Sequence, residues 1–282
     1  MTMIARFELI TVTYNCSDIL RDFLVSVQDS EPNRVSVTVV DNNSHDRSIC
    51  KDYARQFGAR FIALEKNSGY GAAVNAGAKR LPSNIEYIGI CNPDLALEKG
   101  AISTLLSVFE EDKDAVAAGP CILNQDGTPY PSARDIPGIS NGVGHALFKN
   151  IWPDNPWTRS YTQSALGTKR RTCGWLSGAF FIIRRNAFED VGGFDEGFFM
   201  YFEDVDLFSR LQKRPRYEPN AKVKHIGRYS TRQNPKTMLF FHHKSAGRFL
   251  DKKYSKKWQK PVTFLLKLGL KLRYRLQARK LK

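Results

Sequence analysis

The feature that most constrains the fold is an alternation of strand-like and helix-like segments over the first 120 residues. Strand-like apolar runs occupy Phe7–Thr13, Val35–Val40, Arg60–Leu64, Tyr87–Cys91 and Ala115–Gly119. Segments with helical spacing lie between them, at residues 17–27, Ile49–Phe57, Ala72–Arg80 and Ala101–Phe109. Such alternation predicts an α/β fold with a mixed, mostly parallel sheet flanked by helices.

The second half of the chain is organised differently. Residues 122–172 are rich in Pro, Gly, Asn, Trp and Arg and show weak periodicity, which predicts a long irregular insertion. Strand-like sequence returns at Gly174–Arg184 and at Tyr217–His225, with a helical segment at Glu203–Gln212 between them. We therefore expect a main domain over residues 1–235, with the insertion inside it, and a helical tail over residues 236–282.

The positive charge is concentrated in this tail. The whole chain carries a net charge of +15, but residues 242–282 hold 14 Lys and Arg against one acid. The remaining 241 residues hold 29 basic and 27 acidic side chains and are nearly neutral. Within the tail, Phe264, Leu268, Leu272 and Leu276 repeat every four residues beside a stripe of Lys267, Lys271 and Arg275. This pattern predicts a basic amphipathic helix on an anionic membrane surface, although a helix docked on the main domain is an alternative.

Composition and cysteine usage favour a cytoplasmic protein. Hydrophobic residues make up 42% and charged residues 25% of the chain, which excludes disordered and collagen-like classes. No stretch reaches the ~20 apolar residues that cross a bilayer, and Met1–Arg6 lacks the features of a signal peptide. The five cysteines form no C-x-x-C pair, which predicts buried, reduced thiols.

Polar residues follow three of the expected strands. They are Thr13-Tyr14-Asn15, Asp41-Asn42-Asn43-Ser44 and Asn92-Pro93-Asp94. Turn chemistry explains any one of these segments alone. Because ligands of open α/β sheets bind beyond the carboxyl ends of strands, the three together predict a nucleotide site.

The segment Asn67–Gly77 joins a strand to a helix and is rich in small residues. Such a turn lets a ligand approach the backbone, and a helix N-terminus favours a diphosphate. Gly69 and Gly71 match the start of a dinucleotide fingerprint, but Val74 stands where the third glycine belongs. This mismatch argues against an NAD-dependent oxidoreductase.

The segment Gly192–Leu207 carries the strongest signal for chemistry. It places the carboxylates of Asp195, Glu203, Asp204 and Asp206 among five aromatic residues. Carboxylates in such surroundings acquire shifted pKa values and suit general-base work. The alternative, that Glu203 and Asp204 only satisfy a helix dipole, is weaker because the segment is so apolar.

Taken in order, these motifs resemble the family 2 glycosyltransferases with the GT-A fold, over about residues 7–230. The resemblance also includes Trp175-Leu-Ser-Gly-Ala179. Within that family the chain is most similar to bacterial L-rhamnosyltransferases that act on polyprenyl-diphosphate-linked N-acetylglucosamine. This finer similarity rests on Arg134, Trp152-Pro-Asp-Asn-Pro-Trp157 and Phe241-His-His-Lys-Ser-Ala246.

The resemblance implies roles for particular residues. Asp204 is the expected catalytic base, and Asp94 with His225 the expected ligands of Mg²⁺ or Mn²⁺. The expected donor and nucleotide residues are Thr13, Tyr14, Asn15, Asp41, Asn43, Asn67, Gly69, Tyr70, Asn75, Asn92, Pro93 and Asp94. Candidates for the acceptor or sugar pocket, with core packing as their alternative, are Trp175, Ser177, Gly178, Tyr201 and Glu203. Asn92 departs from the family pattern, in which many members carry Asp, and leaves one charge fewer near the metal.

The implied activity is an inverting, metal-dependent transfer of L-rhamnose from dTDP-L-rhamnose to a lipid-linked saccharide. We expect it to serve cell-envelope polysaccharide synthesis at the inner face of the cell membrane, and a homo-oligomer is left open. The alternative is a non-catalytic module that binds nucleotides or nucleic acid through a GT-A-like fold and the basic tail. No helix-turn-helix, zinc-finger or RNP signature occurs, so we expect no nucleic-acid partner.

Overall fold

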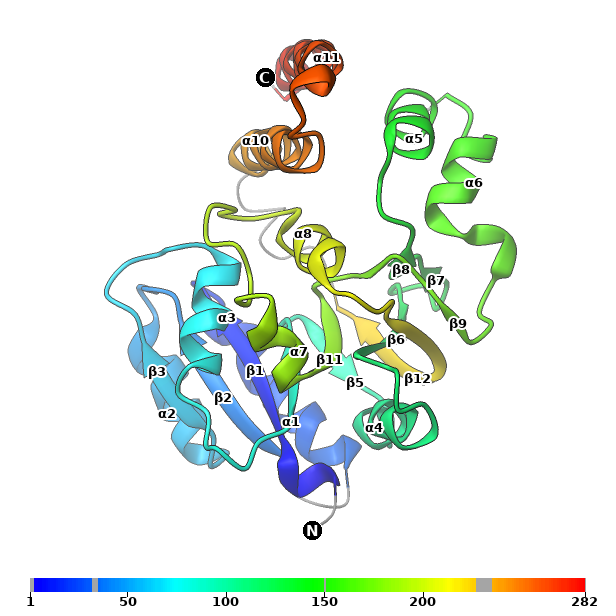
Figure 1. The fold of residues 1–282 in the computed structure, drawn as a ribbon. Coiled ribbons are helices and arrows are strands. Elements are labelled where there is room, and N and C mark those ends of the chain that lie inside the picture. The colour runs from blue at the N-terminus through cyan, green and yellow to red at the C-terminus, as the bar shows by residue number, and fades with distance from the viewer. Residues whose placement is uncertain (1–2, 32–34, 150, 227–234, 282) are drawn as a thin grey trace.

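A computed structural model describes residues 3–31, 35–149, 151–226 and 235–281. It confirms an α/β fold around one large mixed sheet with the strand order β3-β2-β1-β4-β11-β6-β12-β5 (Figure 1). The strands are β1 (Phe7–Thr13), β2 (Ser36–Asp41), β3 (Arg60–Ala63), β4 (Tyr87–Cys91), β5 (Leu95–Leu97), β6 (Ala117–Leu123), β11 (Phe180–Arg184) and β12 (Arg216–His225). Strands β3, β2, β1 and β4 are parallel, β11 is antiparallel to both β4 and β6, and β12 is parallel to β6.

Helices cover both faces of the sheet. They are α1 (Ser17–Ser30), α2 (Arg47–Gln56), α3 (Tyr70–Ala78), α4 (Ala101–Glu111), α7 (Arg185–Asp190) and α8 (Glu203–Arg210). Side chains of α1, α2 and α4 share one core with Phe7 and Leu9 of β1. Side chains of α3, α7 and α8 share the other core with Ile10 and Val12. Strand β1 is therefore buried along its length, because successive residues face opposite cores.

Several boundaries differ from the sequence-based expectation. Helix α1 begins at Ser17, as expected, but extends to Ser30 rather than to residue 27, and no side-chain hydrogen bond from Cys16 caps its start. Instead, the backbone N–H of Ser17 donates to Asp46 Oδ2 at 2.7 Å, which ties α1 to the start of α2. Helix α3 begins at Tyr70 rather than Ala72, and β6 covers Ala117–Leu123 rather than Ala115–Gly119. The pattern also missed β5 and α7, which have only 3 and 6 residues and are too short to show periodicity.

The insertion at residues 122–172 is more regular than its composition indicates. It contains β7 (Pro129–Tyr130), β8 (Ala133–Arg134), the π-helix η2 (Ile139–Val143), α5 (Gly144–Phe148), α6 (Pro156–Thr162), the 3-10 helix η3 (Ser164–Leu166) and β9 (Arg171–Thr172). Helix α6 begins where Asn155 accepts the backbone N–H of Thr158 at 2.8 Å and Pro156 occupies the first turn. Both are common signals of a helix start.

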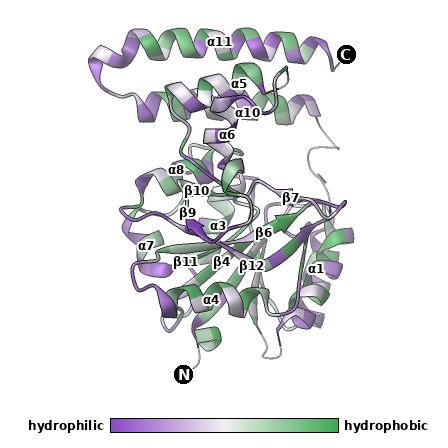
Figure 2. Cartoon of the chain, turned by 90° about the vertical axis from the view of Figure 1, so that its right-hand side faces the viewer, coloured by the Kyte–Doolittle hydropathy of each residue, from purple (hydrophilic) through white to green (hydrophobic). Residues whose placement is uncertain are grey.

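The tail forms two long helices, α10 (Pro235–Lys253) and α11 (Lys260–Arg279), joined by the short 3-10 helix η4 (Lys257–Gln259). Helix α10 lies against the main domain, and α11 lies over α10 on the side away from the sheet (Figure 2). Ser245 of α10 donates to the carbonyl of Met200 at 2.7 Å, and Arg248 pairs with Asp195 at 2.9 Å. None of the helices within the described ranges is long and apolar enough to cross a membrane.

Candidate active site

The carboxyl ends of β1 and β2 meet in a network of polar groups. The backbone N–H of Asn42 donates to the carbonyl of Thr13 at 2.9 Å, which places the two strand ends side by side. The side-chain amide of Asn42 then donates to Asn67 Oδ1 at 3.0 Å and to the Gly69 carbonyl at 3.3 Å. The polar segments after β1 and β2 therefore meet the Asn67–Gly77 segment at one edge of the sheet, as required of a ligand site.

Residues at the end of β1 differ in how far they reach solvent. Thr13 is fully buried, whereas Tyr14 is exposed. Asn15 has a φ of +51° and its Oδ1 accepts the backbone N–H of His45 at 2.8 Å. This bond fixes the loop after β1 against the loop after β2, so Tyr14 and Asn15 form part of the rim of the site.

Asp41 is paired with a residue to which sequence reasoning gave no role. Its carboxylate is fully buried, accepts the backbone N–H of Ser44, and receives Arg47 Nε at 2.8 Å. Arg47 also donates to Asn43 Oδ1 at 3.2 Å. A partly exposed guanidinium thus lies beside the carboxylate that is expected to bind the nucleotide. The sequence does not show this pair, because Arg47 stands six residues after Asp41, at the start of α2.

Gly69 has a conformation that other residues rarely adopt. Its φ is +92°, and a Cβ atom placed there would lie 2.3 Å from the carbonyl oxygen of Phe199. The neighbouring backbone N–H of Tyr70 donates to that same oxygen at 3.0 Å. The start of α3 therefore packs directly on the loop that leads to Asp204, and no side chain fits between them.

Asn75 holds the same loop from the next turn of α3. Its Nδ2 donates to the carbonyl of Phe194 at 2.9 Å, and its Oδ1 accepts the Phe194 N–H at 2.9 Å. The side chain is buried, with both amide atoms engaged by protein. The structure thus gives Asn75 a supporting position behind the expected donor site, with no atom directed to a nucleotide.

Asp94 and His225 are brought together although they are distant in the sequence. Strand β5 pairs with the end of β12, so that His225 Nε2 lies 3.0 Å from Asp94 Oδ2. The other oxygen, Asp94 Oδ1, is buried and has no hydrogen-bond partner within the described part of the chain. A buried carboxylate oxygen without a partner is costly, and a cation would relieve that cost.

This pair fits a divalent ion that takes few ligands from protein. Mg²⁺ is usually held by one or two carboxylates plus phosphate oxygens and water, and Mn²⁺ accepts both carboxylate and imidazole. No third His, Cys, Asp or Glu joins the pair in the described ranges. The remaining ligands would therefore come from a diphosphate and from water. Asn92 precedes this pair in the loop, where its backbone N–H donates to the Ala179 carbonyl at 2.8 Å and Pro93 is buried.

Asp204 stands at the start of α8 on an unusual backbone turn. Tyr201 and Phe202, which precede the helix, have φ values of +66° and +65°, a region that aromatic residues rarely occupy. Asp204 Oδ2 accepts the backbone N–H of Gly178 at 2.8 Å, and Oδ1 accepts that of Val205 at 2.8 Å. Burial raises the pKa of Asp204, while these two hydrogen bonds oppose the rise.

Glu203 and Asp204 have different surroundings. Glu203 Oε2 is buried without a hydrogen-bond partner among the described residues. Burial, and then the negative charge of Asp204, raise the pKa of Glu203 to about 8. Glu203 is therefore protonated at neutral pH, and Asp204, which accepts two N–H groups, is the better base of the two.

Of the expected acceptor residues, Gly178 contacts the Asp204 carboxylate directly, and Trp175 and Ser177 precede Gly178 in the same segment. The hydroxyl of Tyr70 donates to the Gly178 carbonyl at 3.1 Å, so one glycine contacts both Tyr70 and Asp204. Ser177 is half-buried next to it. Trp175 is buried and its Nε1 donates to the Asp135 carbonyl at 2.9 Å, so it acts as a wall of the site rather than a free donor.

Arg134 lies beside this wall and was given no role from the sequence. It is paired with Trp175 across β8 and β10 (Trp175–Leu176), with its guanidinium carbon 5.1 Å from the centre of the Trp175 ring. Its Nη2 also donates to the Tyr130 hydroxyl at 2.7 Å. Burial and the backbone hydrogen bonds affect the pKa of Asp204 most. The nearby charge of Arg134 has a smaller effect and lowers that pKa.

A known family matches most of the main domain. Residues 8–192 match the model of the family described as Glycosyl transferase family 2. The chain belongs to this family. Membership identifies the protein as a glycosyltransferase and decides against both the oxidoreductase and the non-catalytic module.

Curated relatives extend the match into the tail. The chain is 38% identical over 283 residues to the N-acetylglucosaminyl-diphospho-decaprenol L-rhamnosyltransferase of Mycobacterium tuberculosis, which covers 96% of this chain and 92% of that protein. It is 24% identical over 257 residues to Rhamnosyltransferase WbbL of Escherichia coli, covering 87% and 92%.

Solved structures agree on the fold at low sequence identity. The mannosyltransferase PcManGT of Pyrobaculum calidifontis, solved with GDP-Man and Mn²⁺, matches with a TM-score of 0.61 and 14% identity over 97% of this chain and 70% of that one. GalNAc-T7, solved with UDP, GalNAc and Mn²⁺, matches with a TM-score of 0.57 and 17% identity over 79% and 43%. The expected GT-A fold is therefore confirmed.

Proposed function

We propose that this glycosyltransferase moves L-rhamnose from dTDP-L-rhamnose to N-acetylglucosamine carried on a polyprenyl diphosphate. The observation that carries the proposal is the 38% identity to the mycobacterial rhamnosyltransferase over 96% of the chain. Such coverage includes the insertion and most of the tail, and the tail lies outside the residues 8–192 that the family model matches. The proposed product is an intermediate of cell-envelope polysaccharide.

The transfer requires removal of a proton from the acceptor hydroxyl, and we assign this to Asp204. Its carboxylate is held by two backbone N–H groups, so its orientation is fixed before substrate binds. It is only partly buried, so an acceptor can reach it. The deprotonated hydroxyl oxygen then attacks the anomeric carbon opposite the leaving diphosphate, which inverts the configuration without a covalent enzyme intermediate.

The leaving group carries negative charge that must be stabilised. We assign Asp94 and His225 to hold a divalent cation, Mg²⁺ or Mn²⁺, which when bound would neutralise charge on the diphosphate. Helix α3 begins at Tyr70, and its positive end favours a diphosphate at the same place. The nucleotide would then lie over the ends of β1 and β2, between the Asp41–Arg47 pair and Asn67.

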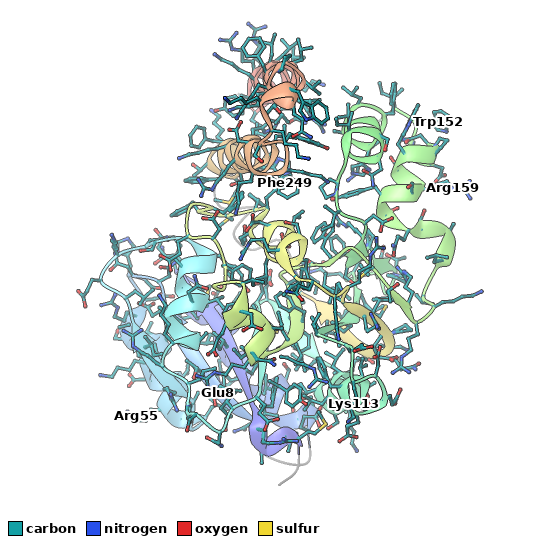
Figure 3. All side chains as sticks on the ribbon, in the orientation of Figure 1. Glu8, Arg55, Lys113, Trp152, Arg159 and Phe249 are labelled. Carbon is teal, nitrogen blue, oxygen red and sulfur yellow. The ribbon has the colours of Figure 1, made fainter. Side chains whose placement is uncertain are left out.

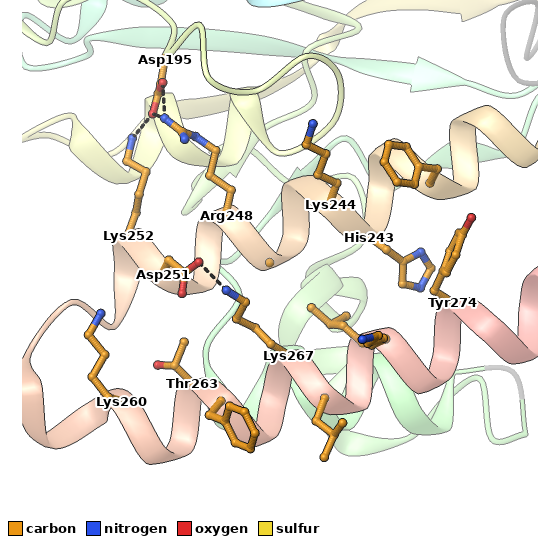
Figure 4. Close-up of a pocket in the computed structure, with 16 residues that line it drawn as sticks. Asp195, His243, Lys244, Arg248, Asp251, Lys252, Lys260, Thr263, Lys267 and Tyr274 are labelled. Atoms are coloured by element: carbon orange, nitrogen blue, oxygen red, sulfur yellow. Dashed lines mark hydrogen bonds and ion pairs between the residues drawn. The ribbon is translucent and has the colours of Figure 1, made fainter.

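The tail supports placement of the enzyme at an anionic membrane surface. Helix α11 packs on α10 through its half-buried side, while Phe264, Leu265, Leu268, Leu272 and Leu276 are more than half exposed. A groove of about 1330 Å³ lies between the two helices (Figure 4). There Asp251 pairs with Lys267, while no ion pair within the described residues involves Lys244, Lys260 or Lys271. An apolar face bordered by lysines fits the headgroup region of the cytoplasmic leaflet.

The test is a transfer assay on the purified full chain. Incubation with dTDP-L-rhamnose, Mg²⁺ or Mn²⁺ and a short-chain prenyl-diphosphate N-acetylglucosamine should give a product one deoxyhexose heavier by mass spectrometry. The anomeric configuration of the new bond, read by NMR, should be opposite to that of the donor. Faster transfer from a UDP- or GDP-sugar would overturn the assignment of the donor, and absence of any product would overturn the proposed reaction.

A further inference from the structure

The insertion carries exposed apolar side chains that neither the core nor the catalytic site uses. Leu147, in the last turn of α5, is 60% exposed, and Ile151 and Trp152, which follow that helix, are 84% and 53% exposed. Trp152 marks the outer tip of this helix pair, on the end of the molecule that also carries the tail (Figure 3). We call Leu147, Ile151 and Trp152 the insertion tip.

The helix pair is rigid enough to present this tip. Phe148 and Trp157 stack with ring centres 5.2 Å apart, and His145 Nδ1 lies 3.1 Å from Thr158 Oγ1. A Cβ atom on Gly144 would lie 2.3 Å from Trp157 Cγ, so the two helices are in close contact. Phe148 and Trp157 remain 39% and 38% exposed, and their stacking joins the two helices that flank the tip.

The insertion is also tied to the tail. Arg273 of α11 donates to the carbonyl of Ala146 in α5, and Lys253 of α10 donates to the Pro137 carbonyl at 2.5 Å. Figures 1 and 2 both place α5 and α6 on the side of the sheet where α10 and α11 lie. The insertion tip and the exposed apolar face of α11 are therefore parts of the same end of the molecule.

We propose that the insertion tip enters the lipid bilayer as a second membrane contact beside α11. Trp is enriched at the interface between headgroups and acyl chains, and Leu and Ile suit the depth just below it. Residues 242–282 of the adjoining tail carry a net charge of +13, which complements an anionic leaflet. A protein partner fits less well, because a stable interface buries about 800 Å² on each side and the tip offers three side chains.

This contact gives the insertion a function in the proposed reaction, on which this step rests. Tyr161 of α6 lies 4.7 Å from His145 of α5 and 6.5 Å from Trp175, measured between ring centres. Trp175 in turn borders Arg134 and the segment that holds Asp204. A chain of aromatic contacts thus runs from α5, the helix that ends at the insertion tip, to Trp175 beside the proposed acceptor pocket. Docking at two points would present a membrane-anchored diphosphate to that pocket in one orientation.

The first experiment measures binding of the full chain to vesicles of phosphatidylglycerol and phosphatidylcholine. The double variant Ile151→Ser/Trp152→Ser should bind at least tenfold more weakly than the wild type. Ile49→Ser, which replaces an exposed isoleucine on α2, is the matched control and should bind like the wild type. Equal binding of the double variant and the wild type overturns the proposal, as does a change in oligomeric state of the double variant on gel filtration.

A second measurement does not depend on how the double variant folds. Lipids brominated near the headgroup should quench tryptophan fluorescence of the wild type, and the conservative Trp152→Phe variant should lose part of that quenching. Retention of all the quenching in Trp152→Phe would show that Trp152 stays outside the bilayer.

Transfer assays separate this proposal from the proposed function. The double variant should keep wild-type transfer to a short-chain, water-soluble acceptor and lose at least tenfold in transfer to a polyprenyl acceptor in vesicles. Equal loss with both acceptors would overturn the membrane contact. A wild type without transfer to either acceptor would overturn the proposed reaction and leave the vesicle result standing.

Discussion

The carboxylate of Asp204 accepts the backbone N–H of Gly178 at 2.8 Å, and the carbonyl of Gly178 accepts the hydroxyl of Tyr70 at 3.1 Å. One peptide segment thus connects the proposed catalytic base on α8 to the first residue of α3, where the donor diphosphate is proposed to lie. A side chain at position 178 would press on this arrangement, since a Cβ atom there would lie 3.3 Å from Asp204 Oδ2.

Replacing the proposed base tests this arrangement directly. Asp204→Asn keeps the shape of the side chain but removes its ability to take a proton. We expect transfer to fall by a factor of about 10²–10⁴, the usual contribution of a general base, while the Kd for the donor changes little. Steady-state kinetics and calorimetry measure the two quantities. Asp190→Asn, at an exposed position on α7, is the control for loss of one charge, and wild-type rates in Asp204→Asn would exclude this residue as the base.

The raised pKa of Glu203 predicts a pH-dependent stability. Its pKa is about 8 in the folded protein, against an ordinary value of 4.5 for a glutamate side chain, so the folded state binds more protons than the unfolded state between these limits. Stability therefore contains a contribution that is fully present below about pH 4.5 and is lost as the pH rises through about 8. Glu203→Gln lacks this contribution to the pH dependence.

The measurement is the difference in melting temperature between wild type and Glu203→Gln from pH 5 to pH 9. The wild type should lose stability relative to the variant as the pH rises, and Glu189→Gln, an exposed position, should follow the wild type. Parallel curves for wild type and Glu203→Gln would mean that Glu203 has an ordinary pKa in the folded protein.

How much of this site could be predicted from the sequence depends on how local each signal is. Strands Phe7–Thr13 and Tyr87–Cys91 have the predicted bounds because both are buried along their length and most of their residues are apolar or β-branched. Asp94 and Asp204 could also be identified from the sequence, because each belongs to a motif of neighbouring residues. The approach of His225 to Asp94 is not, since it depends on β5 pairing with β12, and β5 was not predicted at all.

The structural partners of these motifs could not be predicted for the same reason. Arg47 approaches Asp41, and Arg134 approaches Trp175, only through the packing of helices and strands. The positive φ values of Tyr201 and Phe202 leave no mark in the sequence, because aromatic residues have no preference for that conformation. Helices α5 and α6 have 5 and 7 residues, too few for a periodic pattern, although Asn155-Pro156 was a usable start signal.

Metal binding should depend on the Asp94–His225 pair. We expect His225→Ala to weaken Mn²⁺ binding at least tenfold in the presence of dTDP, because half of the proposed protein ligands is lost. Thermal shift with Mn²⁺ and dTDP measures the effect, since a ligand bound only by the folded state raises the melting temperature. His243→Ala, on α10, is the matched control. A wild-type response of His225→Ala to Mn²⁺ would remove His225 from the metal site.

The close contact at Gly69 predicts an unequal effect of two glycine substitutions. Gly58 and Gly69 both have positive φ, but a Cβ atom on Gly58 meets nothing within 4 Å, whereas one on Gly69 meets Phe199 O at 2.3 Å. Gly58→Ala should therefore cost only the conformational strain of about 1–2 kcal/mol. Gly69→Ala should cost more than about 3 kcal/mol in the free energy of unfolding, or weaken donor binding as the loop moves, because the overlapping atom belongs to backbone. Urea denaturation measures the change in stability, and donor titration measures the change in binding. Equal effects of the two substitutions would indicate that α3 and the 192–202 loop do not pack as described.

The last prediction concerns the binding of the tail to anionic vesicles and how that binding depends on salt. Deleting residues 256–282 removes α11 with its exposed apolar face and most of the cationic charge, and leaves α10 attached through Ser245 and Arg248. Each Lys or Arg near an anionic surface contributes about 1 kcal/mol, and that attraction is screened within a Debye length. We expect the deleted protein to leave anionic vesicles at moderate salt while the intact chain stays bound through its apolar face. The full-length variant Leu268→Ser/Leu272→Ser separates the electrostatic from the apolar contribution. It should bind vesicles at low salt and dissociate as the salt concentration rises. Vesicle binding that changes neither with salt nor with these substitutions would show that α11 is not the anchor.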